Sequence, residues 1–158
     1  MNFIYKSIIT FFFTGYIRFA PGTIASFFAM VVWFFIPNNL IVQLSILFML
    51  LFLSLYLCYL HSINSDIKDP SYIVVDEVVG IFISLFMLPK QLSFYIIGFI
   101  MFRIFDILKP SIIYNVQNLK YGIGILADDI IAGLFTICLL YTSPSPRDAH
   151  ESRMPSSA

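Results

Sequence analysis

Residues 40–60 form the longest apolar run of the chain, 21 residues without a charged side chain. About 20 apolar residues in a helix are needed to cross the hydrocarbon core of a bilayer, so this run predicts a membrane-spanning helix. Shorter apolar blocks occupy residues 24–36, 73–88, 91–102 and 130–141. None of them has a sustained polar face, which indicates helices that are buried or face lipid. We predict an all-α, polytopic membrane helical bundle of about four to five helices.

The composition excludes several other classes of protein. Hydrophobic residues make up 59% of the 158 positions and charged residues only 11%, whereas an average soluble domain carries about 25% charged residues. The formal net charge is zero, so we expect no basic face for nucleic acid. Cys58 and Cys138 stand alone inside apolar runs, which argues against a disulfide scaffold and against metal or redox use of these thiols.

Two proline-containing breaks predict how the helices are arranged. Residues 37–39 and residues 89–90 each separate two apolar blocks, and we expect each break to close a helical hairpin. The two arms of the second hairpin are short, and the longer one, over residues 73–88, has only about 16 residues, or about 24 Å of helix. They are therefore either tilted into a thin region of the membrane or shielded by the longer helices. If residues 73–102 instead formed one kinked span, the segments before and after them would lie on opposite faces.

With two hairpins, the polar segments of the chain all fall on one membrane face, and we expect the motif loops there. The basic residues on this shared face are Lys6, Arg18, Lys68, Arg103, Lys109 and Lys120. Lys90 is the one basic residue of residues 1–141 expected on the opposite face. The positive-inside rule then makes the shared face cytoplasmic. Trp33 and several tyrosines are expected to anchor the helices at the membrane interface.

The chain divides at one sharp change of character. Residues 142–158 contain five serines and three prolines and no Phe, Ile, Leu, Val, Tyr or Trp. Such a segment buries too little apolar surface to fold, so we expect a disordered, non-native tail. Residues 1–141 then form one membrane-embedded domain. Only about a dozen apolar residues follow Asp129, which predicts that the last helix is too short to span a bilayer.

The acidic residues are placed unusually for so apolar a chain. All seven in residues 1–141 lie between positions 66 and 129, and five stand at the edge of apolar helices or inside them: Asp76, Glu77, Asp106, Asp128 and Asp129. A carboxylate inside a membrane span costs about 2.5–3.5 kcal/mol unless it is paired or binds a cation. Helix caps and solubilising charges are the alternative explanation. Two acidic pairs plus Asp106 on one face favour a site for a hard cation such as Mg²⁺, Ca²⁺ or Mn²⁺.

Basic and small residues accompany these carboxylates. Arg103, Asp106 and Lys109 are spaced i, i+3 and i+6, so a continuous helix would turn all three to one side. Two cations beside carboxylates are suited to binding phosphate, while a structural i, i+3 salt bridge is the competing interpretation. Near the N-terminus, Thr23 follows a Pro-Gly turn and is expected to cap the next helix, whose free N–H groups would suit an anionic oxygen. An ordinary capped loop explains that segment equally well.

Four motifs occur in order along the chain: A-P-G-T-x-x-S at residues 20–26, D-P-x-x-I-V-x-D-E-x-x-G at 69–80, F-R-x-F-D-I-x-K-P at 102–110 and G-x-G-I-x-x-D-D-x-x-A-G at 122–133. Together they resemble the phosphatidylglycerophosphatase A family, over about residues 15–135. The resemblance implies a helical, Mg²⁺-dependent enzyme of the bacterial inner membrane that converts phosphatidylglycerophosphate to phosphatidylglycerol and phosphate.

The resemblance, together with the residue types, suggests a role for each candidate site residue. The expected Mg²⁺ ligands are Asp76, Glu77, Asp128 and Asp129, and Asp106 is expected to serve as a further ligand or as the base that orients water. We expect Arg103, Lys109 and Thr23 to bind the substrate. Two alternatives remain: a small ion transporter or channel subunit with intramembrane carboxylates, and a phosphatase for another lipid phosphate. A transporter predicts carboxylates near helix centres, along a path across the bilayer.

Overall fold

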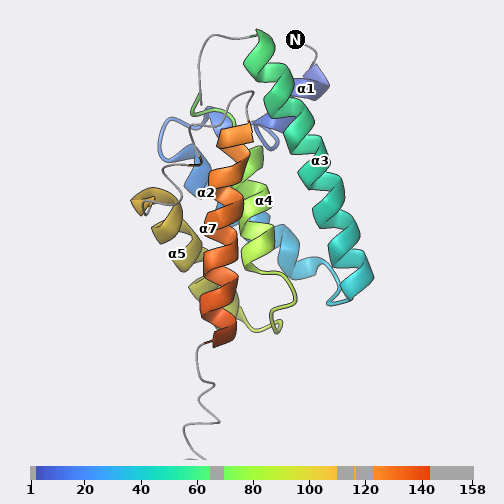
Figure 1. The fold of residues 1–158 in the computed structure, drawn as a ribbon, viewed down its shortest axis with the longest axis vertical. Helices are drawn as coiled ribbons and strands as arrows, with labels where there is room; N and C mark the ends of the chain where they lie inside the picture. The colour runs from blue at the N-terminus through green and yellow to red at the C-terminus, as the bar shows by residue number, and fades with distance from the viewer. Residues whose placement is uncertain (1–2, 65–69, 110–115, 117–122, 143–158) are drawn as a thin grey trace, which may run out of the picture.

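The computed structural model describes residues 3–64, 70–109, 116 and 123–142. All regular secondary structure within them is helical (Figure 1). The elements are α1 (Phe3–Ile9), the 3-10 helix η1 (Thr14–Tyr16), α2 (Pro21–Phe35), α3 (Leu40–Asn64), α4 (Val75–Ser84), α5 (Leu92–Leu108) and α7 (Ile123–Thr142). The all-α prediction is confirmed, but the described part has six α-helices, because the first residues form a short helix of their own. Of the expected tail, Thr142 is the last residue of α7, and residues 143–158 lie outside the described part.

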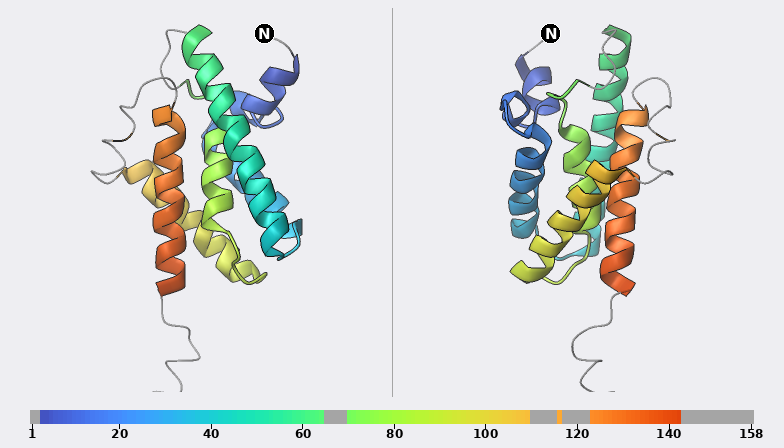
Figure 2. Two further views of the ribbon diagram at one scale, coloured as in Figure 1. Left: turned by 45° about the vertical axis from the view of Figure 1, so that its right-hand side comes forward. Right: turned by 90° about the vertical axis from the view of Figure 1, so that its left-hand side faces the viewer.

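α4 is the central helix of the bundle, although it is only 10 residues long. It contacts α2, α3, α5 and α7, and both views of Figure 2 show it enclosed by them. Eight of its residues are buried, including its glycine and one carboxylate. The expected arm over residues 73–88 is therefore too long, because the helix ends at Ser84. Of the two explanations for a short arm, shielding by neighbouring helices is the one the structure shows.

Within the described part of the chain, two helices are long and apolar enough to cross a membrane: Leu40–Ile63 within α3, and α7. α3 keeps most of its surface exposed, with Phe48, Phe52 and Tyr56 pointing outward. α7 has 20 residues because it begins at Ile123, before its acidic pair rather than after it. The prediction of a last helix too short to span a bilayer is therefore wrong.

The chain direction reverses between α2 and α3 and again between α4 and α5, as the two proline breaks predict (Figure 1). As a result, the starts of α2, α4 and α7 and the end of α5 gather at one end of the bundle. We call this the motif end, and we call the opposite end, with residues 36–39 and 85–91, the turn end. Lys90 lies at the turn end, where its ammonium donates to the Phe34 carbonyl at 2.7 Å.

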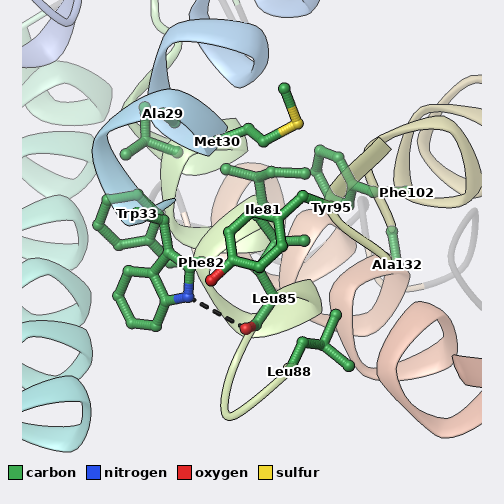
Figure 3. Packing of buried hydrophobic residues seen from close by; sticks show 11 residues of the cluster. Ala29, Met30, Trp33, Ile81, Phe82, Leu85, Leu88, Tyr95, Phe102 and Ala132 are labelled. Atoms are coloured by element: carbon green, nitrogen blue, oxygen red, sulfur yellow. Dashed lines mark hydrogen bonds between the residues drawn. The ribbon is translucent and has the colours of Figure 1, made fainter. Parts of the chain in front are cut away.

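Between the two ends, large side chains fill the space between α2, α4 and α5 (Figure 3). Trp33 lies against Phe82, with ring centroids 4.5 Å apart, and its indole Nε1 donates to the carbonyl of Leu85 at 3.0 Å. Trp33 is completely buried, so its expected role as an interfacial anchor is wrong. The hydrogen bond explains why an indole is tolerated there, since a buried N–H needs an acceptor.

Candidate active site

A cavity of about 400 Å³ opens at the motif end of the bundle. Its walls come from the start of α2, the segment before α4, the first turn of α4, the end of α5 and the first half of α7. All eight predicted site residues line it: Thr23, Asp76, Glu77, Arg103, Asp106, Lys109, Asp128 and Asp129. The structure therefore brings together residues that are more than 100 positions apart in the sequence.

The carboxylates of α4 and α7 come close because these two helices touch backbone to backbone. A Cβ on Gly133 would lie 2.6 Å from the carbonyl oxygen of Gly80, and a Cβ on Gly80 would lie 2.9 Å from that of Asp129. Both distances are too short for a side chain, so glycine is required at both positions. Asp76 and Asp129 each precede one of these glycines by four residues, and both are buried, at 5% and 3% exposed.

Helix capping does not account for the acidic pairs. In α4 the N-cap residue is Val74, and no side chain caps the helix end, although Asp76 and Glu77 do lie in the first turn. In α7 the pair occupies the sixth and seventh positions, because the segment before it is already helical from Ile123. A helix dipole stabilises acidic residues in the first turn of a helix. Asp128 and Asp129 lie beyond that turn, so the dipole does not explain their position.

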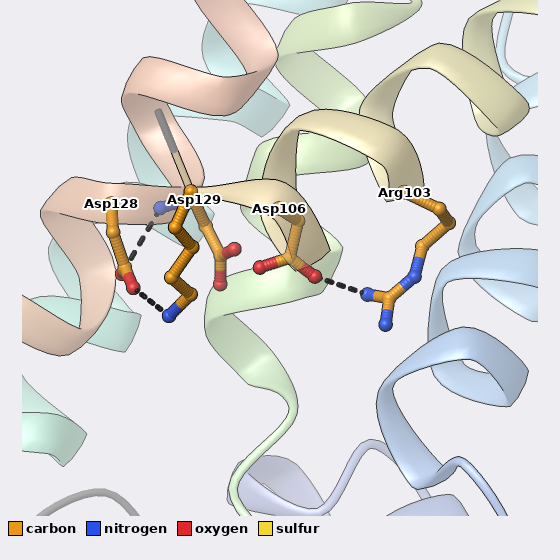
Figure 4. Close-up of polar contacts among 5 residues, drawn as sticks. Arg103, Asp106, Asp128 and Asp129 are labelled. Atoms are coloured by element: carbon orange, nitrogen blue, oxygen red, sulfur yellow. Dashed lines mark hydrogen bonds and ion pairs between the residues drawn. The ribbon is translucent and has the colours of Figure 1, made fainter. Parts of the chain in front are cut away.

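The two cations of the cavity each contact a carboxylate. Arg103 Nη1 lies 2.6 Å from Asp106 Oδ2, so the i, i+3 salt bridge considered from the sequence is present. Lys109 Nζ lies 2.6 Å from Asp128 Oδ2 on α7. In the view of Figure 4, Asp129 lies between Asp128 and the Arg103–Asp106 pair.

Lys109 reaches α7 because it does not continue α5. The helix ends at Leu108, and Lys109 adopts a left-handed conformation with φ of 39°, so the expectation of three side chains on one helical face is wrong for this residue. Burial lowers the pKa of the Lys109 ammonium. Its hydrogen bond to Asp128 and the nearby charges of Asp128, Asp106 and Asp129 outweigh that effect, and the pKa rises above its usual value.

The start of α2 forms another wall. The helix begins at Pro21, with Ala20 as N-cap in a left-handed conformation at φ of 46°, so Thr23 is the third helical residue and not the expected cap. Proline is favourable at the first helical position, because the backbone N–H that proline lacks would have no intrahelical partner there. The cavity wall also includes Gly22 and Ser71, which were not predicted as site residues although both stand inside the first two motifs.

The cavity carries more negative than positive charge. Its lining has five carboxylates and two basic side chains, a formal excess of three negative charges. Within the described residues, Glu77 Oε2, Asp129 Oδ1 and Arg103 Nε are buried and make no hydrogen bond. Buried polar atoms in this state are costly unless a ligand completes them.

As the side chains stand, no three His, Cys, Asp or Glu residues of the described part form a group that could hold a metal ion. The chemistry of the donor set nevertheless fits a hard divalent cation, because carboxylate oxygens are the preferred ligands of Mg²⁺ and Ca²⁺. The negative excess and the unpartnered oxygens of Glu77 and Asp129 point the same way.

Comparison with known proteins identifies the family. The sequence profile described as Phosphatidylglycerophosphatase A matches residues 7–143. The chain belongs to the phosphatidylglycerophosphatase A family. The predicted resemblance is thereby confirmed, and it extends beyond the four motifs to nearly all of the helices.

Three bacterial relatives illustrate the similarity. A Bacteroides thetaiotaomicron protein named as a phosphatidylinositol-3-phosphatase is 33% identical over 135 residues, covering 80% of this chain and 85% of that protein. The phosphatidylglycerophosphatase A of Escherichia coli is 35% identical over 129 residues, covering 77% of this chain and 72% of the relative. That of Haemophilus influenzae is 34% identical over 132 residues, covering 81% of each. No solved structure matches the chain significantly.

Family membership makes the chain a lipid phosphatase, a hydrolase of phosphoric monoesters. The cavity is consistent with this class, since it combines carboxylates with an arginine and a lysine. Its carboxylates gather at one end of the bundle rather than along a path between the two ends, which is the opposite of what the transporter alternative predicts.

Proposed function

We propose that this chain hydrolyses phosphatidylglycerophosphate to phosphatidylglycerol and inorganic phosphate. The observation that carries the proposal is the convergence of all four motifs on one charged cavity at an end of an apolar helical bundle. A lipid phosphate has an apolar tail and a charged head, and such a junction accommodates both parts. The two relatives named phosphatidylglycerophosphatase A support this substrate.

Arg103 and Lys109 bind the phosphate in this proposal. Both side chains are partly exposed to the cavity, 14% and 27%, and each is already oriented by a carboxylate. Charged hydrogen bonds to phosphate oxygens are strong, and they offset the negative charge that an attacking nucleophile meets. Thr23 contacts the substrate from the start of α2, where backbone N–H groups favour an anionic oxygen.

Asp76, Glu77, Asp128 and Asp129 would hold one or two Mg²⁺ ions. A bound Mg²⁺ would supply Lewis-acid polarisation of the phosphoryl group and a more acidic water. Asp106 would be a further ligand or would orient the attacking water, held in place by Arg103 at 2.6 Å. The excess of negative charge in the cavity supports these assignments, since Mg²⁺ would neutralise it.

The protein would lie in the bacterial inner membrane, with the cavity facing the cytoplasm. α3 and α7 support membrane insertion by their length and composition, and the relatives are bacterial. The basic residues Arg103 and Lys109 stand at the motif end and Lys90 at the turn end, as the positive-inside rule requires. Single cysteines at positions 18 and 90, in a chain lacking Cys58 and Cys138, should react with an impermeant thiol reagent from opposite sides of the membrane. Labelling of both from one side would contradict this orientation.

A panel of lipid phosphomonoesters tests the substrate. The purified protein would be given phosphatidylglycerophosphate, phosphatidylinositol-3-phosphate and phosphatidic acid in detergent micelles with Mg²⁺, and phosphate release would be measured. We expect phosphatidylglycerophosphate to be hydrolysed with the highest kcat/KM. A preference for phosphatidylinositol-3-phosphate would contradict the proposed substrate and would favour the one in the name of the Bacteroides relative. Asp128→Asn, prepared identically, controls for contaminating phosphatases.

A further inference from the structure

Gly22 leaves room for the carboxylate of Glu77. It is the second residue of α2, and it lies in the cavity wall. A methyl group on its Cα would overlap Oε1 of Glu77 and approach Nη1 of Arg103 to 3.5 Å. The absent side chain is therefore replaced by the end of a glutamate from a different helix.

We propose that Gly22 is a positioning residue, which seats the Glu77 carboxylate between the start of α2 and Arg103. The inference rests on the proposed function, in which Glu77 is one of the carboxylates that hold the divalent cation. One oxygen, Oε1, lies against Gly22, and the other, Oε2, is buried and has no hydrogen-bond partner among the described residues. Seating Oε1 in this way leaves Oε2 available to a ligand.

The location of this seat has a physical reason. A glutamate side chain has three rotatable bonds, so a fixed carboxylate position requires contacts beyond its own helix. The first turn of α2 has N–H groups without intrahelical partners and carries partial positive charge. The nearby Arg103 adds a full positive charge on the same side. A carboxylate is stabilised there only if it can approach closely, and any residue larger than glycine would prevent this approach.

Alanine at position 22 should separate function from stability. The atom that its methyl group overlaps is the end of a flexible side chain, so the fold can accommodate the change when Glu77 swings away. Alanine also favours helical backbone over glycine, because glycine loses more conformational entropy on folding. Gly22→Ala should therefore remain folded, with an unchanged or raised melting temperature, and should still lose activity.

Gly98 provides the matched control. It lies in α5 and is absent from the cavity lining, and a Cβ there would meet Leu85 Cδ2 at 2.8 Å and Leu140 Cδ1 at 3.4 Å. We expect Gly22→Ala to lower kcat/KM on phosphatidylglycerophosphate at least tenfold. We expect Gly98→Ala to keep kcat/KM within about twofold of the wild type, because overpacking there affects the core and not the cavity. Equal activities for wild type and Gly22→Ala would overturn the inference.

A second measurement needs neither substrate nor Mg²⁺. Melting temperatures in detergent with EDTA would be compared for wild type, Gly22→Ala, Glu77→Ala and the double variant. Without a glutamate to displace, alanine at position 22 should raise the melting temperature more in the Glu77→Ala background than in the wild type. Equal shifts in both backgrounds would show that Gly22 and Glu77 are not coupled.

The melting temperatures of these four proteins also remain informative if Gly22→Ala does not fold or if the wild type is inactive. If Gly22→Ala alone did not fold, recovery of folding in the double variant would support the inference, and failure of both would overturn it. If the wild type hydrolysed no lipid phosphate, the proposed function would fail, while the melting temperatures would still report whether Gly22 seats Glu77.

Discussion

The two ends of this bundle treat buried polar groups in opposite ways. At the turn end such groups have partners: the Leu85 carbonyl accepts from the indole of Trp33, which lies just below this end, at 3.0 Å. The Gln43 side chain, 1% exposed, donates to Asn38 Oδ1 at 3.1 Å and accepts from the Met87 N–H at 2.9 Å. The bonds from the Trp33 indole and from the Met87 N–H join segments more than 40 residues apart, so they hold the two turns of the bundle in register.

At the motif end, several buried polar atoms lack partners within the described part of the chain, among them Glu77 Oε2, Asp129 Oδ1 and Arg103 Nε. Because the fold provides hydrogen-bond partners for buried polar groups at the turn end, the unpartnered atoms at the motif end are not a general property of the fold. Conflicts with the rules of folding are expected where function requires them. The difference between the ends therefore indicates that the motif end is built around a ligand and the turn end around stability.

Removal of divalent cations should produce the largest effect and tests the comparison most directly. If carboxylates of the motif end hold Mg²⁺, excess EDTA should abolish phosphate release, and added Mg²⁺ should restore it. Initial rates on phosphatidylglycerophosphate, measured against free Mg²⁺ concentration, would show this. Full turnover in EDTA would mean that the unpartnered carboxylates serve some purpose other than binding a metal.

Neutralising one carboxylate of the cavity should have the next largest effect on the catalytic rate. Asp76→Asn and Asp128→Asn keep the side-chain size but remove a charge, and each should lower kcat by about 10²–10⁴, which corresponds to ~3–5 kcal/mol of transition-state stabilisation. The melting temperature of Asp76→Asn should not fall, because the excess of negative charge in the cavity decreases. Asp128→Asn also removes the charged partner of Lys109, so it should fold with a lowered melting temperature.

Asp66→Asn, at an acidic residue outside the four motifs, is the matched control and should retain its rate. Near-wild-type kinetics for both cavity variants would mean that the acidic pairs have a structural role. The contrast between the two ends would then have to be explained without catalysis.

Much of the motif end could be predicted from the sequence, because its chemistry is local. Carboxylates in an apolar chain are conspicuous, and two proline breaks are enough to place them on one face. All eight predicted residues line the cavity for this reason. The same motifs also place Gly80 and Gly133 four residues after Asp76 and Asp129, at the positions where α4 and α7 touch backbone to backbone.

The remaining features depend on tertiary partners that local patterns do not identify. Burial of Trp33 requires the Leu85 carbonyl, which is 52 residues away. The left-handed end of α5 at Lys109 turns its side chain from the helix face toward Asp128, 19 residues away. The role of Gly22 likewise becomes visible only when Glu77 is placed against it. Sequence spacing predicted which residues meet, and packing decided how they meet.

Lys109→Met should have a smaller effect, and one that differs in kind. If the ammonium binds the substrate phosphate in both the ground state and the transition state, KM should rise at least as much as kcat falls. Loss of a charged hydrogen bond of about 1.5–3 kcal/mol corresponds to about 10-fold to 100-fold in kcat/KM. A fall in kcat at constant KM would contradict this and would show that Lys109 acts by holding Asp128, its partner at 2.6 Å.

Trp33→Phe should have the smallest effect on catalysis, and it tests the comparison from the turn end. The change keeps an aromatic ring against Phe82 but removes the indole donor of the buried Leu85 carbonyl, which then accepts only the longer bond from the Leu88 N–H at 3.3 Å. Loss of one buried hydrogen bond costs about 0.5–1.5 kcal/mol of unfolding free energy, so the melting temperature should fall. The initial rate, measured well below that temperature, should stay within about twofold of the wild type, because no cavity residue is altered. This pattern is the reverse of that expected for Asp76→Asn, which loses rate and keeps stability. A tenfold loss of rate in folded Trp33→Phe would show that α2 and α4 transmit changes from the core to the cavity, and the two ends could no longer be treated as independent.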